Sequence, residues 1–276
     1  FLKILEGLKN CEKRVVVTFH SEPVFLKALG LFNWENKKCA RIWKKIGKLF
    51  TKENNITAIT HTDVSTNKFI RSGFKNAVTI THGVVERKFS KSTRLPKKSD
   101  SVVLSIFGFI APYKGYEFAL AIMDLLPENF KLCIIGGRHP ASDAEEIGEL
   151  LKWVTERGML SRIMITGWVT PDEADFYQQN SDVCLAPYQT RELSASGAIT
   201  WSLTSKRPVI ASNINSFRDI NKVDQCMVLC HPTDRLEWIW AIKKVVEDQI
   251  LRDRLVKNAD NYCEKNSWTN ICKQHM

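Results

Sequence analysis

Glycines, small hydroxyl residues and cations follow apolar runs of strand length at three places in the chain. The first run is Val102–Phe107, and directly after it comes Gly108-Phe-Ile-Ala-Pro-Tyr-Lys114-Gly115. A glycine turn between a buried strand and a helix gathers backbone N–H groups at the positive end of that helix, and Lys114 adds a full charge. We therefore predict an anion site here, although the spacing is not that of a P-loop. The alternative is a surface lysine beside an ordinary turn.

The second place is the end of another strand-like run, at Ile134-Ile-Gly136-Gly137. Paired glycines allow a ligand to approach the backbone closely. In open α/β sheets, ligands bind at the carboxyl ends of the strands. We predict that Gly136 and Gly137 line the same site as Lys114. A plain strand-to-loop turn explains the two glycines equally well.

The third place follows Val183–Ala186 and reads Pro187-Tyr-Gln-Thr-Arg-Glu192-Leu-Ser194-Ala-Ser196-Gly197-Ala198. Small residues at the start of a helix leave N–H groups open to a diphosphate. Glu192 is suited to accept hydrogen bonds from sugar hydroxyls. Helix capping by Ser194 and Ser196 is the alternative, but it does not explain why an arginine and a glutamate share this loop.

Strand-like and helix-like segments alternate along the part of the chain that contains these motifs. Between residues 100 and 260 the expected strands are Val102–Phe107, Lys131–Ile135, Ile163–Thr166, Val183–Ala186, Pro208–Ala211 and Met227–Cys230. The expected helices are Glu117–Leu126, Ala144–Arg157, Pro171–Asn180, Ser196–Leu203 and Leu236–Val246, and a last helix covers Asn258–His275. Strands that are apolar throughout are typical of sheets buried on both faces. The alternation predicts a doubly wound parallel sheet.

The first 90 residues show a shorter form of the same pattern. Strands are expected at Val15–Phe19, Thr57–Thr60 and Ala77–Thr81, with a helix at Lys37–Lys52. The polar, basic stretch Ser90–Ser99 reads as a linker. The expected fold class is therefore α/β, with two Rossmann-like domains built on parallel sheets. Their expected boundaries are 1–92 for the N-terminal domain, 93–100 for the linker, 101–257 for the C-terminal domain and 258–276 for a closing helix.

The charge is distributed unevenly between the two halves. The chain carries a formal net charge of +10, but residues 1–98 hold 21 Lys and Arg against 7 Asp and Glu, and the remainder is acidic. A field of one sign attracts anions such as phosphates or an anionic membrane surface. Nucleic acid is disfavoured as a partner, because no platform of stacking aromatic residues accompanies the lysines.

The cysteines and the hydropathy of the chain limit the cellular compartments in which the protein is expected. Eight cysteines are present and none forms a C-x-x-C pair, so we expect free thiols in a reducing compartment and no zinc site. Cys226 and Cys230 are the only close pair and lack a second pair of ligands. No stretch reaches the ~20 apolar residues of a membrane span. The expected location is cytoplasmic, at the inner face of a membrane if the acceptor is lipid-linked.

A membrane contact is predicted by the segment Lys37–Lys52. Its apolar residues recur at helical period among lysines and an arginine, so one face is apolar and the other cationic. That pattern is typical of helices that lie on an anionic membrane surface. The alternative is an ordinary helix that packs against its own sheet.

In this order, the motifs resemble the donor domain of the family 4 glycosyltransferases. The resemblance covers roughly residues 13–275 and is strongest over 102–220. It rests on Gly108…Lys114-Gly115, Ile134-Ile-Gly136, Thr166-Gly-Trp168-Val169, Asp182-Val-Cys-Leu-Ala-Pro187, Glu192…Ser196-Gly197 and Arg207-Pro-Val-Ile-Ala-Ser212. It implies the GT-B fold, transfer with retention of anomeric configuration, and a nucleotide-diphosphate sugar of UDP or GDP type as donor, with no cofactor and no metal.

The same resemblance assigns roles to individual residues. Lys114 would contact the donor diphosphate and Glu192 would lie near the transferred sugar. The implied donor-binding set is Gly108, Lys114, Gly136, Gly137, Trp168, Val169, Ser194, Ser196, Gly197, Ala198 and Thr200. Two positions depart from the family pattern. Phe109 replaces a phosphate-binding arginine, and Thr200 replaces the glutamate that binds ribose, which puts donor affinity or nucleotide choice in doubt.

The first half resembles the end of the family's acceptor domain. Val15-Val-Val-Thr-Phe-His20 matches a strand that ends in a histidine facing the donor sugar, so the resemblance implies a catalytic role for His20 beside Glu192. A structural hydrogen bond is the alternative. For His82, at the end of the next matching strand, we favour the structural role. The acceptor domain usually begins with several more strands, so we expect the N-terminal domain here to be incomplete: a gene fragment, a processed product or one chain of a split enzyme.

The expected activity is hexose transfer from a nucleotide-diphosphate sugar to a hydroxyl of a glycan or lipid-linked acceptor. Two other classes stay open. One is a different enzyme of the same fold, such as a sugar-nucleotide epimerase or a phosphorylase. The other is a catalytically silent protein that binds nucleotide sugars.

Overall fold

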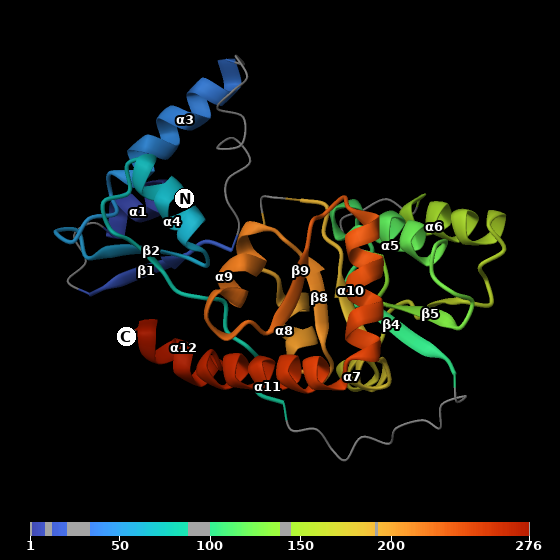
Figure 1. Cartoon of the computed structure of the whole chain (residues 1–276). Coiled ribbons are helices and arrows are strands. Elements are labelled where there is room, and N and C mark those ends of the chain that lie inside the picture. Colours follow the sequence, from blue (N-terminus) through green and yellow to red (C-terminus); the bar gives the residue numbers. More distant parts are fainter. Residues whose placement is uncertain are drawn as a thin grey trace. The chain divides into compact units, whose positions relative to one another are not determined.

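The computed structural model describes residues 2–8, 13–20, 34–87, 100–138, 145–190 and 193–275. The expected linker at 93–100 lies almost wholly outside these ranges. The chain divides into two compact units (Figure 1). Unit 1 comprises Phe1–Gly83, Glu192–Ser196 and Trp268–Met276, and unit 2 comprises Val84–Arg191 and Gly197–Ser267.

Unit 1 is built on a three-stranded parallel sheet. The strands lie in the order β1 (Val15–Thr18), β2 (Ile56–Thr60), β3 (Ala77–Thr79). The helices are α1 (Leu2–Leu8), α3 (Trp34–Gly47), α4 (Asp63–Arg71) and α12 (Trp268–His275). Side chains of alternate residues in a strand point to opposite faces, so β2 contributes Ile56 and Ala58 to the main core of the unit and Ile59 to a smaller cluster with Ile271 of α12.

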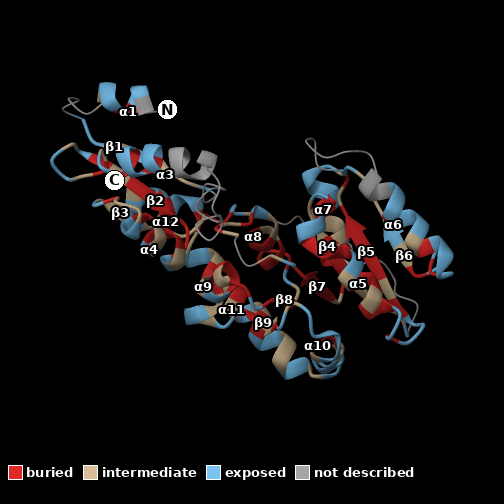
Figure 2. Ribbon diagram, turned by 90° about the horizontal axis from the view of Figure 1, so that it is seen from above, coloured by how far each residue is buried: buried red, intermediate tan, exposed pale blue. Residues whose placement is uncertain are grey.

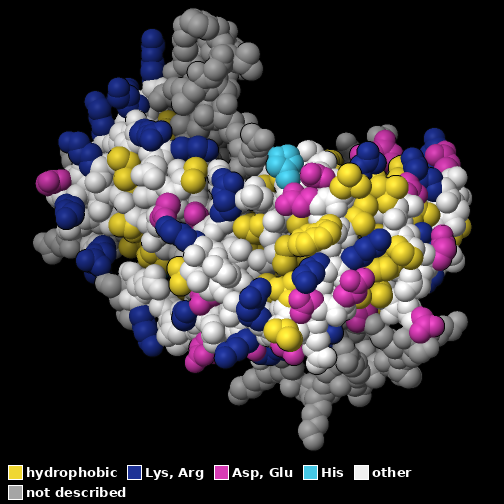
Figure 3. Space-filling view, viewed as in Figure 1, with side chains coloured by type: hydrophobic (Ala, Val, Ile, Leu, Met, Phe, Trp, Pro, Cys, Tyr) yellow, Lys and Arg dark blue, Asp and Glu magenta, His cyan; other side chains and the backbone are white. Residues whose placement is uncertain are grey.

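The helix expected at Lys37–Lys52 is displaced toward the N-terminus and packs inward. It runs from Trp34 to Gly47 as α3. Trp43 and Ile46 are buried in the core of unit 1, as is Phe50 just beyond the helix. These apolar side chains are therefore not available to a membrane in this conformation. On the face shown in Figure 3, the charged side chains that stand out from unit 1 are mainly Lys and Arg.

Unit 2 is built on a six-stranded sheet in which every pairing is parallel. The order is β6 (Ile163–Ile165), β5 (Phe130–Ile135), β4 (Val102–Phe107), β7 (Val183–Ala186), β8 (Val209–Ser212), β9 (Met227–Cys230). Each apolar run predicted to form a strand in this part of the chain forms one, within one residue at either end. The strands are apolar because helices cover both faces, as the buried strands in Figure 2 show.

The helices of unit 2 divide between the two faces of its sheet. One core cluster joins the sheet to α5 (Tyr116–Met123), α6 (Glu145–Glu156) and α10 (Arg235–Glu247). A second cluster joins the opposite face to α7 (Pro171–Gln179) and α8 (Gly197–Leu203). The helix α9 (Asn215–Asp224) was not predicted.

The expectation of one continuous helix over Asn258–His275 was wrong. The structure has α11 (Gln249–Lys265) and α12, separated by Asn266 and Ser267. The carbonyl of Asn266 accepts a hydrogen bond of 2.8 Å from the N–H of Val84, and Ser267 forms a β-bridge with the same residue. This pairing with a distant segment uses backbone groups that a continuous helix would need, and the local sequence does not reveal it.

Candidate functional site

Lys114 lies at the carboxyl ends of the unit 2 sheet, at the end of the short helix η1 (Pro112–Lys114). Its side chain is only 4% exposed, and its ammonium donates a hydrogen bond to the Tyr188 hydroxyl. Burial lowers the pKa of Lys114 to about 8. No ion pair involves it within the described parts of the chain. An ammonium held out of water without a carboxylate partner is costly, and a bound anion would supply the missing charge.

Gly108 brings the first and third sequence motifs together. A Cβ atom placed on this residue would lie 2.9 Å from the Lys114 Nζ and 3.3 Å from the Cβ of Ala198 in the first turn of α8. Its φ of 121° also disfavours any residue with a side chain. The carbonyl of Gly108 accepts a 3.0 Å hydrogen bond from the Tyr116 hydroxyl, which helps to hold the loop in place. Gly108, Lys114 and Ala198 are therefore neighbours, as the predicted anion site requires.

The double glycine of the second motif has a structural explanation. A Cβ on Gly136 would come within 2.2 Å of the Gly108 carbonyl oxygen, and one on Gly137 within 2.6 Å of the Trp168 indole. The two glycines thus allow the loops after β4, β5 and β6 to approach one another. Trp168 is 66% exposed and meets the ring of Phe109 edge to face at 5.3 Å. The structure places Gly136 against the backbone of Gly108 and Gly137 against the Trp168 ring.

The side chains of three predicted donor-binding residues make contacts within the protein itself. The Thr200 hydroxyl is buried and donates a 3.0 Å hydrogen bond to the Gly197 carbonyl within its own helix. In this arrangement the Thr200 hydroxyl could only accept a hydrogen bond from a ribose hydroxyl, because its own hydrogen is used. Val169 packs against a core cluster of the sheet. Ser194, which groups with unit 1, donates its hydroxyl to the backbone carbonyl of His20. Ser196 is also buried, and Gly197 is exposed.

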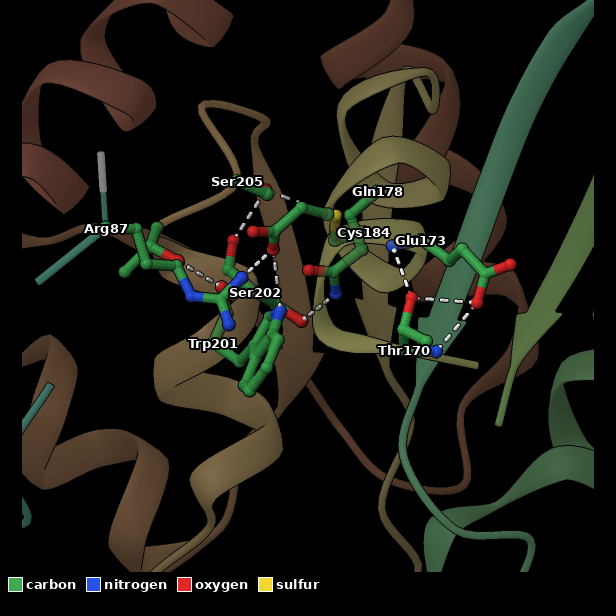
Figure 4. A network of polar contacts seen from close by, with 10 residues as sticks. Arg87, Thr170, Glu173, Gln178, Cys184, Trp201, Ser202 and Ser205 are labelled. Atoms are coloured by element: carbon green, nitrogen blue, oxygen red, sulfur yellow. Dashed lines mark hydrogen bonds and ion pairs between the residues drawn. The ribbon is translucent and has the colours of Figure 1, made fainter. Parts of the chain in front are cut away.

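A polar network holds α8 in place (Figure 4). The Trp201 indole N–H donates a 3.0 Å hydrogen bond to Asp175 of α7, and the Arg87 guanidinium lies 3.2 Å from the centre of the Trp201 ring while pairing with Asp175. A helix of seven residues is short and gains little stability from its own backbone. Arg87 and Asp175 therefore fix the orientation of α8, whose first turn carries Ala198. The sequence analysis did not identify this network, because its members are far apart in the chain.

Three histidines gather at the carboxyl ends of the unit 1 strands. His20 follows β1, His61 follows β2 and His82 follows β3. The ring centroids are 4.8 Å apart for His20–His61 and 5.4 Å for His61–His82. His82 bonds the Gly83 carbonyl through Nδ1 at 2.8 Å and meets the Trp268 ring at 5.3 Å, which supports a structural role. His61 was missed, since only the parallel pairing of strands brings it beside His20.

Other predicted features are located as follows. Glu192 lies outside the described residues. Cys226 and Cys230 are free, buried thiols, and burial raises the pKa of each to about 12. Within the described ranges, no group of three or more His, Cys, Asp or Glu is arranged to hold a metal ion. No helix in those ranges combines the length and apolar character needed to cross a membrane.

Solved structures share this arrangement of parallel sheets and confirm the expected α/β fold of GT-B type. Sucrose-phosphate synthase from Thermosynechococcus elongatus aligns with a TM-score of 0.77 at 20% sequence identity, over 98% of this chain and 68% of that one. The Anabaena protein HepE in complex with UDP aligns with a TM-score of 0.78 at 15% identity, over 99% of this chain and 74% of that one.

The sequence gives the family. The model of the family "Glycosyl transferases group 1" matches residues 87–262, which is more than half of the chain, and the protein belongs to this family. A curated relative, alpha-D-kanosaminyltransferase from Streptomyces kanamyceticus, is 24% identical over 162 residues. That alignment covers 58% of this chain and 40% of the relative, so this chain spans less than half the length of that protein.

Proposed function

We propose that this protein transfers a hexose, with retention of anomeric configuration, from a nucleotide-diphosphate sugar to an acceptor hydroxyl. One observation carries the proposal: the buried Lys114 ammonium and the first turn of α8 both lie next to Gly108, at the carboxyl ends of the unit 2 strands. This pair of features fits a pyrophosphate. In the proposed organisation, residues 101–257 bind the donor, residues 1–92 belong to the acceptor side, and 258–276 close the fold after a linker at 93–100.

Lys114 and α8 would act on the leaving group. As the bond between sugar and phosphate breaks, negative charge grows on the diphosphate. Groups that are already oriented toward that charge lower the barrier without reorganising. The Lys114 ammonium would supply a full charge and the N–H groups of Gly197 and Ala198 partial charges. No metal is required in this scheme, because these groups neutralise the diphosphate.

His20 and Glu192 are proposed to act on the sugar. His20 is exposed at the end of β1, where it can hydrogen-bond a hydroxyl or support positive charge in an oxocarbenium-like transition state. Glu192 would accept hydrogen bonds from sugar hydroxyls. The chain offers no evident nucleophile, so we propose attack on the same face as the departing phosphate, assisted by that phosphate. Closure around the donor would exclude water and so prevent hydrolysis.

The proposed donor class is a UDP- or GDP-sugar. UDP is favoured because structures of HepE contain UDP and UDP-glucose and because the fold is shared. Gly136, Gly137, Trp168 and Val169 are proposed to line the nucleotide side of the site, with Ser194, Ser196 and Thr200 nearer the phosphates and ribose. The proposed acceptor is a glycan or a lipid-linked hydroxyl compound at the cytoplasmic face of a membrane.

Two measurements test the proposal. A thermal-shift screen against UDP-, GDP-, ADP- and dTDP-sugars should raise the melting temperature for one nucleotide class, because a ligand that binds only the folded state stabilises it. Transfer of radiolabel from that donor to an acceptor should then occur. The Glu192→Ala variant should lose turnover and keep nucleotide binding. If no nucleotide sugar stabilises the protein, the proposal is wrong.

A catalytically silent nucleotide-sugar binder is the second candidate. It is favoured by two positions: Phe109 stands where the resembled family has an arginine, and the Thr200 hydroxyl is committed to its own helix. Stabilisation by a nucleotide sugar without transfer or hydrolysis, under conditions that include acceptors, would support this candidate. Interconversion of one nucleotide sugar into another would instead indicate an epimerase.

A further inference from the structure

The histidine cluster of unit 1 fixes its own protonation pattern. His61 is 7% exposed and lies between two hydrogen-bonding groups. Its Nδ1 is 2.9 Å from the backbone carbonyl oxygen of Ile80, and its Nε2 is 3.0 Å from Nδ1 of His20. A carbonyl oxygen only accepts hydrogen bonds. The Nδ1 of His61 must therefore carry a hydrogen.

The other nitrogen of His61 follows from its charge. The pKa of His61 falls from its ordinary value of 6.5 to about 4, mainly through burial and to a smaller extent through the neighbouring His20, His82 and His275 rings, while the bond to Ile80 opposes the shift. The ring is thus neutral at physiological pH. A neutral imidazole with a hydrogen on Nδ1 has a bare Nε2, which accepts hydrogen bonds.

This arrangement determines the state of His20. Because the Nε2 of His61 accepts, the Nδ1 of His20 must donate across the 3.0 Å contact. When the His20 ring is neutral, its hydrogen is on Nδ1 and its Nε2 carries a lone pair. The side chain is exposed, and within the described residues no hydrogen bond reaches that Nε2. The ring is anchored through one nitrogen and presents the other.

We propose that His61 is a positioning residue, which holds the His20 ring in the tautomer whose bare Nε2 accepts a hydrogen bond from a hydroxyl of the donor sugar. This inference rests on the proposed function for the identity of the ligand. The chain of contacts runs from the Ile80 carbonyl through His61 to His20. His82 is not part of it, because its Nδ1 bonds the Gly83 carbonyl.

The tautomer can be observed directly by two-bond ¹H–¹⁵N NMR of protein labelled at histidine nitrogens. In the unmutated protein, His20 should show a protonated Nδ1 and a bare Nε2. In His61→Phe the anchor is lost, and His20 should revert to the Nε2–H tautomer that free imidazole side chains favour in water. His61→Gln places an amide oxygen near the position of the lost nitrogen and should restore the Nδ1–H tautomer. His82→Phe is the matched control and should leave His20 unchanged.

Activity gives the second measurement. We expect His61→Phe to reduce kcat about tenfold or more with little change in the KM for the donor, and His61→Gln to recover much of the loss. Thermal unfolding verifies that each variant folds. The inference is wrong if His20 keeps its Nδ1–H tautomer in His61→Phe. It is also wrong if a variant whose His20 has changed tautomer keeps full turnover. A protein that transfers no sugar at all ends the proposed function and leaves the tautomer assignment standing, so the two failures are distinguishable.

Discussion

At the scale of single residues, Lys114 is a buried cation whose charged form is destabilised by its surroundings. Taking an ammonium out of water without a carboxylate partner costs free energy, and the fall of its pKa to about 8 expresses that cost. Tyr188 offers one neutral hydrogen bond in return. A diphosphate would supply the missing negative charge. The sequence revealed Lys114 because glycines flank it, whereas its contact with Tyr188, 74 positions further along, was not predicted.

Replacing Lys114 by Met should therefore separate binding from stability. Met has a similar shape and no charge, so the free energy of unfolding should stay the same or rise. The affinity for UDP should fall at least about tenfold, which corresponds to the ~1.4 kcal/mol or more expected for a lost charge-assisted hydrogen bond. Isothermal titration calorimetry and urea unfolding measure the two quantities.

The matched control is Lys206→Met, which removes an exposed lysine that pairs with Asp260 in the same unit. This variant should leave UDP affinity unchanged. Equal affinities for the Lys114 and Lys206 variants would contradict the assignment of Lys114 to the diphosphate.

The lowered pKa of His61 predicts how the free energy of unfolding changes at acid pH. Its pKa in the folded protein, about 4, lies below the ordinary value of 6.5. As the pH falls through 6.5, the unfolded chain therefore takes up a proton that the folded chain does not, and the free energy of unfolding falls. The expected loss between pH 7 and pH 5 is about 2 kcal/mol. Urea unfolding of His61→Gln should show a correspondingly flatter profile over that interval. Profiles that coincide would mean that His61 is not buried in its neutral form.

At the scale of elements, the sheets were the most predictable part of the fold. An apolar run such as Val183–Ala186 predicts a strand buried on both faces, and all four of its residues are buried. The helices were less predictable where contacts with distant segments override the local pattern of apolar residues. The break between α11 and α12 depends on Val84, far away in the sequence, and α9 has only Phe217 and Ile220 as buried apolar residues. The contact between His20 and His61 likewise needs the sheet to form first.

Gly115, at the start of α5, packs so closely against the loop after β7 that no side chain fits there. Gly115 has a φ of 75°, and a Cβ there would come within 1.8 Å of the Pro187 carbonyl oxygen. Gly115→Ala should therefore lower the free energy of unfolding by more than about 2 kcal/mol, through both backbone strain and a clash with backbone. Chemical denaturation measures this change.

Gly148→Ala in α6 is the matched control. Nothing lies within 4 Å of a Cβ at this helical position, so alanine should stabilise the protein by about 0.5–1 kcal/mol. Similar effects of the two substitutions would show that the close approach between Gly115 and Pro187 is not present.

At the scale of the whole molecule, charge distinguishes the two ends of the chain. Residues 1–98 carry an excess of 14 positive charges, the difference between 21 Lys and Arg and 7 Asp and Glu. The apolar residues Trp43, Ile46 and Phe50 are buried in unit 1. We therefore expect membrane contact through these three side chains to be absent in this conformation, and the lysines and arginines of this part of the chain to carry any contact with an anionic surface.

Vesicle binding tests this expectation. The protein should sediment with vesicles that contain phosphatidylglycerol at low ionic strength and be released at about 0.5 M salt, where screening is short-ranged. Replacing Lys44, Lys45 and Lys48 by Gln should weaken binding more than replacing Lys243 and Lys244 of α10. Binding that survives high salt, or that occurs equally on neutral phosphatidylcholine vesicles, would contradict the electrostatic account.

The central claim is that the Lys114 ammonium meets a diphosphate, and proton uptake on binding tests it most directly. At pH 8.5 a lysine with a pKa near 8 is mainly neutral, and an adjacent diphosphate would raise that pKa and draw in a proton. Calorimetric titration with UDP in two buffers of different ionisation enthalpy should show uptake of roughly half a proton or more per UDP bound. Uptake should be negligible at pH 6.5 and in Lys114→Met. Binding of UDP by the unmutated protein at pH 8.5 with no proton uptake would contradict the account.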